Sequence, residues 1–139
     1  FGFSDVLTVF LAMDSYVELY KGGIVPLEQF AGMKKDNDIL VRLIVKKTPC
    51  KVVYSSMRNQ RTDFPVIACA VAQMNGEYRA SIGARPARAM LIRNENAEGF
   101  ASFVAENAPT EGNIRGSAAY RTHLIKVLVE RSMNELGGM

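Results

Sequence analysis

The chain has 139 residues, of which 48% are hydrophobic, and its 17 Lys and Arg against 14 Asp and Glu give a formal net charge of +3. This composition excludes a disordered tail, which needs few apolar residues and a large net charge, and 11 Gly with 5 Pro exclude a collagen-like chain. The basic residues are scattered along the sequence, so the small positive charge predicts no nucleic-acid partner. A chain of about 150 residues buries roughly 68 to 70% of its unfolded surface, enough for a core without metals or disulfides.

Cys50 and Cys69 are the two cysteines, and His123 is the single histidine. These three residues cannot build a zinc site of normal spacing. Both cysteines lie in apolar, strand-like runs, which favours buried reduced thiols in a cytoplasmic protein over a disulfide. The longest apolar runs, 6–13 and 66–72, are far shorter than the ~20 residues that span a bilayer. We therefore predict no membrane segment.

The first predicted element is a short buried helix or segment over residues 6–13, which are continuously apolar between Asp5 and Asp14. The sequence leaves two roles open for Asp5. A carboxylate ahead of an apolar helical run caps that helix, whereas in a loop it is an exposed acceptor for a ligand N–H.

A β-hairpin follows this helix in the prediction. Residues 15–20 alternate in polarity, 21–23 (KGG) form a turn, and 24–25 return as a strand. Residues 26–30 (PLEQF) predict a helical turn that begins at proline, and 39–45 predict a further strand.

Charge, Thr and Pro in 46–49 (KKTP) separate two strand-like runs, and we place a domain boundary there, between 1–47 and 48–139. In the second part, Asn75-Gly76 is a strong hairpin signal. The strands expected there are 51–56, 66–73, 78–82 and 90–92.

Two helices are expected near the C-terminus, over 96–107 and 117–136. Ser117 is the expected N-cap of the second, and we expect one face to hold Tyr120, Leu124, Val127, Leu128 and Arg131. Strands first and helices last predict an α+β fold, an antiparallel sheet with helices on one face.

No catalytic motif follows from the residues alone. His123 is expected on a helix surface, and 112–117 (GNIRGS) lack the spacing and the lysine of a phosphate-binding loop, so a helix entry is favoured. The remaining arginines are expected to be solvated in loops or at the rim of an interface: Arg58, Arg61, Arg85 and Arg88.

Three ordered motifs carry a family resemblance. They are 61–72 (RTDFPVIACAVA), 81–89 (SIGARPARA) and 114–124 (IRGSAAYRTHL), followed by 127–129 (VLV). Together they resemble the C-terminal domain of the FAD-binding subunit of molybdenum hydroxylases, which include xanthine dehydrogenase and carbon monoxide dehydrogenase. Upstream, 9–14 (VFLAMD) and the segments after it look like the last third of that family's FAD-binding domain.

The resemblance implies a C-terminal portion of such a subunit, inactive alone, with its main FAD-binding loops before Phe1. It implies that Asp5 accepts a hydrogen bond from the flavin ring, that Leu40 packs beside the ring, and that the aromatic side chain of Phe64 approaches it. Ser55 stands where some members carry a lysine near the flavin.

The same resemblance implies the partners. A molybdenum-binding large subunit and an iron–sulfur small subunit would carry the molybdenum cofactor and the clusters, with electrons passing to FAD and then to an acceptor. Arg115 or Arg121 is expected to hold the last helix on its domain through acids or carbonyls. The alternative is an interaction and assembly module of such a complex without redox work.

Overall fold

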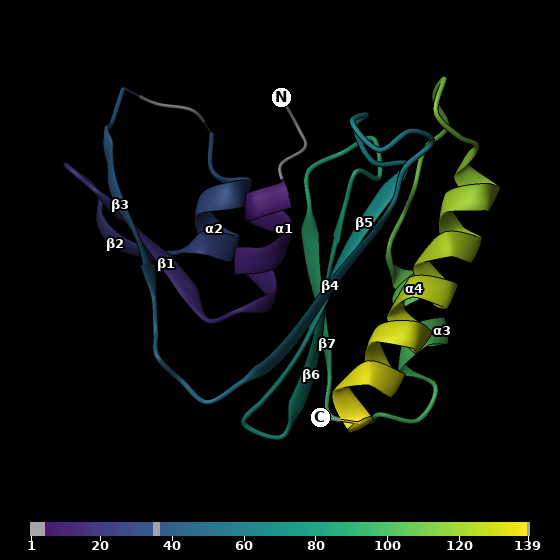
Figure 1. The fold of residues 1–139 in the computed structure, drawn as a ribbon. Coiled ribbons are helices and arrows are strands. Elements are labelled where there is room, and N and C mark those ends of the chain that lie inside the picture. The colour runs from purple at the N-terminus through teal and green to yellow at the C-terminus, as the bar shows by residue number, and fades with distance from the viewer. Residues whose placement is uncertain (1–4, 35–36, 139) are drawn as a thin grey trace.

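The computed structural model describes residues 5–34 and 37–138. Within them the chain forms two antiparallel sheets that follow one another in sequence (Figure 1). The elements in chain order are α1 (Asp5–Ala12), β1 (Ser15–Leu19), β2 (Gly23–Pro26), α2 (Leu27–Gly32), β3 (Leu40–Val45), β4 (Lys51–Met57), β5 (Ile67–Met74), β6 (Glu77–Gly83), β7 (Met90–Asn94), α3 (Phe100–Asn107) and α4 (Ala118–Gly138).

The first sheet has the strand order β2-β1-β3 and contains the predicted hairpin. Its turn is held by Asp38, whose carboxylate accepts hydrogen bonds from the backbone N–H groups of Lys21 at 2.9 Å and Gly22 at 2.8 Å. These backbone hydrogen bonds lower the pKa of the Asp38 carboxylate, and the bond from Lys21 has the largest effect. Side chains of β1 alternate between buried and half-buried, so one face of the sheet packs against α1 and α2.

The second sheet has the order β4-β5-β6-β7, and α3 and α4 cover one of its faces (Figure 1). Between this face and the helices lies the main core, where Ile67, Ile82, Phe100, Val104 and Ile125 are all at most 1% exposed. The predicted α+β class, with the two C-terminal helices on one face of an antiparallel sheet, is confirmed.

The other face of the second sheet is covered by α1, which belongs to the first part of the sequence (Figure 1). On this face β5 presents the small side chains of Ala70 and Ala72, which form one fully buried cluster with Ala12 of α1. Small residues let a helix approach the strands closely, because no longer side chain separates the two backbones. Both faces of this sheet are therefore covered.

The change of sheet falls between Val45 and Lys51, where the sequence placed the break. The division into two domains stays a prediction, since α1 from the first segment packs on the second sheet. Ser117 accepts a hydrogen bond from the backbone N–H of Tyr120 at 3.2 Å, as its predicted N-cap role requires.

The predicted face of the last helix is partly wrong. Leu124 and Leu128 are buried as expected, but Tyr120 is 44% exposed and Arg131 lies on the solvent side. Arg121 replaces them in the interior and is completely buried. The polarity pattern predicted the wrong face because it assigns every arginine to the surface. It carries no information on the carbonyl acceptors that allow Arg121 to be buried.

Candidate functional site

Asp5 lies in the first turn of α1, where the partial positive charge of the helix N-terminus favours a carboxylate. Arg58 Nη2 donates to both of its oxygens, at 3.1 Å to Oδ1 and 3.2 Å to Oδ2, and the Tyr54 hydroxyl also donates to Oδ1. Burial, followed by the hydrogen bond to Asp5, raises the pKa of Tyr54. The Asp5 side chain keeps 45% of its surface exposed, so its carboxylate is still accessible from solvent.

Arg58 connects Asp5 to the loop between β4 and β5. Its Nη1 donates to the carbonyl oxygen of Asp63 at 2.6 Å, while the Asp63 carboxylate accepts the backbone N–H of Phe64 at 2.7 Å. Arg115 closes the group, because its Nη2 lies 3.3 Å from Asp63 Oδ1 and its guanidinium carbon lies 5.4 Å from the centre of the Phe64 ring. Asp5 and Phe64 thus belong to one connected polar cluster, although Phe64 itself is 53% exposed.

Arg121 fixes the start of α4 beneath this loop. Its Nε donates to the carbonyl oxygen of Val66 at 2.8 Å, and Nη1 donates to the carbonyls of Glu111 at 2.7 Å and Gly116 at 2.5 Å. Burial, with the charge of Arg115 second, lowers the pKa of Arg121. The expectation that an arginine of this motif holds the last helix through carbonyls is confirmed.

The other two candidate residues lie apart from this cluster. Leu40 begins β3 in the first sheet, opposite Leu19, and is 48% exposed. Ser55 lies in β4, but its Oγ is 3.5 Å from Ser132 Oγ of α4. Since neighbouring strand residues point to opposite faces, Ser55 faces α4 while Tyr54 reaches Asp5 on the α1 side.

The expectation that four arginines lie solvated in loops or at the rim of an interface holds for Arg61 and Arg88, which are exposed, whereas Arg58 and Arg85 are half-buried. Three of the four also have structural partners. Arg58 binds Asp5 and the loop, as above. Arg85 donates to the carbonyls of Arg88 at 2.8 Å and Pro109 at 2.9 Å, and Arg88 Nη1 donates to the carbonyl of Ala31 in α2. Sequence reasoning missed Arg58 and Tyr54 because their partner, Asp5, is about fifty positions away in the chain. The sequence feature closest to this cluster was the 61–72 motif, which contains Asp63.

Among residues 5–34 and 37–138, none of the helices is long and apolar enough to cross a membrane. Nor does that part of the chain gather three or more His, Cys, Asp or Glu side chains that could hold a metal ion. Both cysteines are free thiols, with Cys69 buried and Cys50 partly exposed.

Solved structures of three enzymes share this fold. A chain of the quinoline 2-oxidoreductase of Pseudomonas putida 86 matches 96% of this chain at 16% identity and a TM-score of 0.73. A chain of the carbon monoxide dehydrogenase of Hydrogenophaga pseudoflava, a form that lacks the molybdenum-pyranopterin moiety, matches 96% at 17% identity and a TM-score of 0.75. A chain of a Cu,Mo-CO dehydrogenase in its cyanide-inactivated form matches 95% at 16% identity and a TM-score of 0.72.

These likenesses establish a fold shared with chains of a quinoline oxidoreductase and of two carbon monoxide dehydrogenases. No protein-family model and no curated protein sequence matches the chain. The chain spans just over half the length of the chains it matches, with 55 to 56% of each covered.

Proposed function

We propose that this chain is the C-terminal part of the FAD-binding subunit of a cytoplasmic, xanthine dehydrogenase-like molybdenum hydroxylase. In such an enzyme a molybdenum subunit and an iron–sulfur subunit would pass electrons to the flavin. The observation that carries the proposal is the fold, which 96% of this chain shares with a carbon monoxide dehydrogenase chain. The ordered motifs around Asp63, Arg88 and Arg115 support it independently.

The Asp5 carboxylate fits the role of an acceptor for a flavin ring N–H. An ionised carboxylate offers about four acceptor positions on its two oxygens. Tyr54 and Arg58 occupy three of them with the bonds described above. One position and nearly half of the side-chain surface stay available, and the two donors hold the carboxylate in a fixed orientation.

Phe64 and Leu40 offer exposed apolar surface to a planar ring, since about half of each side chain is accessible. Arg115 restricts Phe64, because its guanidinium lies over the ring and the Phe64 N–H is bound to Asp63. Ser55 faces the α4 side of its sheet, away from Asp5, and is left out of the proposed set. Leu40, on the separate first sheet, stays in the set with Asp5 and Phe64 on the resemblance of motifs.

FAD, when bound, would supply the electron-transfer chemistry itself. The residues of this chain would position the ring and set its surroundings. Arg58 neutralises Asp5 and joins it to the loop that carries Phe64, so the acceptor and the aromatic side chain are held by one guanidinium. This arrangement supports a positioning role and assigns no catalytic residue to the chain.

The test is Asp5→Ala in the complete subunit assembled with its partners. A hydrogen bond to a charged group contributes about 1.5 to 3 kcal/mol, so we expect roughly 10- to 150-fold weaker flavin binding or a shifted reduction potential. Flavin content per chain and a redox titration measure this. The matched control is Asp14→Asn at the other end of α1, where the carboxylate pairs with Lys46 at 3.3 Å, and it should retain flavin.

Two results would contradict the proposal. A complete subunit that binds no flavin under any condition would exclude the FAD-binding role. In that case the exposed apolar side chains of β3, among them Val41 at 52% and Leu43 at 37% exposed, favour the alternative of an assembly module. An unchanged flavin potential and content in Asp5→Ala would remove Asp5 from the site.

A further inference from the structure

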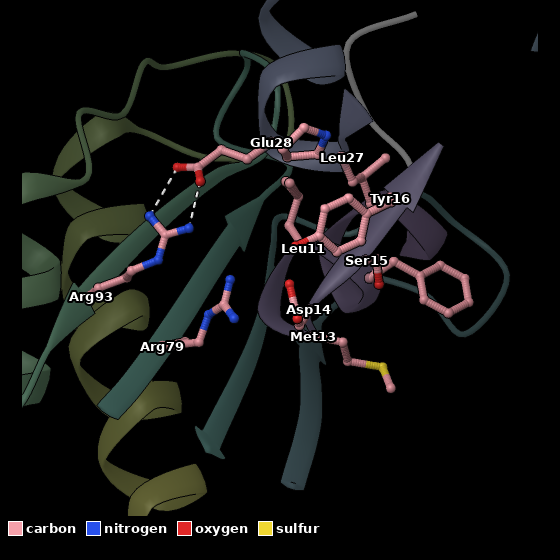
Figure 2. Close-up of a pocket in the computed structure, with 11 residues that line it drawn as sticks. Leu11, Met13, Asp14, Ser15, Tyr16, Leu27, Glu28, Arg79 and Arg93 are labelled. Atoms are coloured by element: carbon pink, nitrogen blue, oxygen red, sulfur yellow. Dashed lines mark hydrogen bonds and ion pairs between the residues drawn. The ribbon is translucent and has the colours of Figure 1, made fainter. Parts of the chain in front are cut away.

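A cavity of about 270 Å³ lies at the C-terminal end of α1, between the first sheet and strands β6 and β7 (Figure 2). Asp5 is at the opposite end of this eight-residue helix, roughly 10 Å away at 1.5 Å per residue. The cavity is therefore separate from the cluster around Asp5. Its volume is close to the lower limit of ~300 Å³ for small-molecule sites.

Arg79 of β6 points its guanidinium into this cavity (Figure 2). The residue is only 9% exposed, and its Nε is buried without a hydrogen-bond partner among the described residues. The contact that Nη1 makes is to the thioether sulfur of Met74 at 3.0 Å, which is a weak acceptor. A buried cation whose donors lack good acceptors is costly, so this arrangement points to an acceptor that enters the cavity.

The acidic side chains around the cavity bind other bases. Glu28 accepts two hydrogen bonds from Arg93, at 3.1 Å and 2.5 Å (Figure 2). Glu77, next to the cavity lining, lies 3.5 Å from Arg93 Nε. Asp14 pairs with Lys46. Among these ion pairs of the described residues, none includes Arg79. The three carboxylates (Glu28, Glu77 and Asp14) and the three basic side chains (Arg93, Lys46 and Arg79) carry charges that sum to zero. The surroundings of the cavity therefore tolerate one added negative charge better than two.

A second unpartnered donor lines the cavity from the first sheet. Ser15 of β1 lines the cavity and is 5% exposed, and its Oγ is buried with no hydrogen-bond partner in the part of the chain that the structure describes. The lining also includes apolar side chains from α1 and α2, among them Phe10, Leu11 and Leu27. A lining that combines two free donors with apolar side chains suits an amphipathic ligand.

We propose that this cavity binds a small organic monocarboxylate. Its carboxylate would accept hydrogen bonds from Arg79 and Ser15, because guanidinium and carboxylate are matched in shape and charge. Its apolar body would lie against Phe10, Leu11 and Leu27. A phosphate group fits less well, because it has no apolar body and brings about two negative charges into a group that is already neutral.

The test uses the full chain and benzoate as the probe, followed by amide NMR and calorimetry. We expect chemical-shift changes at cavity residues and an affinity at least tenfold higher for benzoate than for benzamide or inorganic phosphate. This comparison needs no variant, so it does not depend on whether a variant folds. Benzamide keeps the shape and removes the charge, and phosphate is an anion without the apolar body.

Variants locate the binding energy. Arg79→Gln should weaken benzoate binding at least tenfold and Ser15→Ala severalfold. Arg42→Gln is the matched control, because Arg42 is an exposed arginine that pairs with Glu18 at 2.5 Å and does not line the cavity. Benzoate and benzamide binding equally, phosphate competing equally, or no shifts at cavity residues would each overturn the proposal. None of these results bears on flavin binding at Asp5.

Discussion

Arg121 joins three parts of the chain through one side chain. Its nitrogens bind the carbonyl that precedes β5, two carbonyls of the 111–116 segment, and the side chain of Asn113 at 2.6 Å. The planar guanidinium, with five N–H donors in a fixed geometry, suits such divergent acceptors, which an ammonium group cannot reach together. The start of α4 and the loop near Phe64 are therefore positioned by the same residue.

We expect Arg121→Met to lower the free energy of unfolding by about 3 kcal/mol or more, because several charge-assisted hydrogen bonds are lost and buried carbonyls remain unpaired. Urea unfolding followed by circular dichroism measures the change. Arg131→Met on the exposed side of the same helix is the control and should stay within about 0.5 kcal/mol of the parent. Equal stability of the two variants would contradict the anchoring role.

Cys69 lies in the centre of β5 and is completely buried, and burial raises the pKa of its thiol to about 12. Because the thiolate is the reactive form, we expect Cys69 to resist maleimide at about pH 8 while Cys50 reacts. Mass spectrometry should show one label per native chain and two after denaturation. Two labels on the native chain would show that β5 opens.

Residue roles in the site were only partly predictable from the sequence. Asp5, Leu40 and Phe64 came from a resemblance of motifs. Asp5 and Arg58 are far apart in the sequence, so no local pattern predicts that they pair. The residues next to Arg58 in the sequence are polar, as they would be for a solvated loop residue. Burial of Arg79 was equally invisible, since its strand alternates polarity as a surface strand does.

At the scale of elements, local signals located most helices and strands. The Asn75-Gly76 pair predicts a tight hairpin, and the structure has positive φ at both residues, 52° and 79°, between β5 and β6. The helix over 96–107 is shorter than expected, since α3 begins only at Phe100 behind Gly99. What local signals could not supply was the packing of α1, because an apolar run indicates burial without naming the surface that buries it.

Gly76→Ala tests the hairpin. Its φ of +79° places an L residue in the left-handed region, which costs roughly 1 to 2 kcal/mol, so unfolding free energy should fall by that amount. Gly137→Ala is the matched control, because an added Cβ there meets nothing within 4 Å in the last turn of a helix, and it should stabilise by up to about 1 kcal/mol. Chemical denaturation compares them, and no loss in Gly76→Ala would refute the turn assignment.

At the scale of the whole molecule, the candidate flavin contacts are restricted to the ring. The described residues offer an acceptor and apolar surfaces, whereas the glycine-containing 111–116 segment directs two carbonyls to Arg121 rather than amides to a phosphate. Pyrophosphate binding would then depend on other parts of the proposed subunit.

We therefore expect residues 1–139 alone to bind FAD no better than riboflavin, and neither at micromolar concentration. Isothermal titration of both compounds measures this directly. The complete subunit is the positive control and should prefer FAD. Micromolar FAD affinity of the isolated chain would contradict this division of contacts.

The position of α1 has a consequence for chain integrity. This helix is covalently part of the segment before 46–50 but fills the alanine-lined surface of the sheet that follows it. A protease cut within 46–50 should therefore leave two pieces that stay associated, each completing the other. Co-elution of both pieces on size-exclusion chromatography measures this, and Ala70→Leu, which obstructs the surface, should release them.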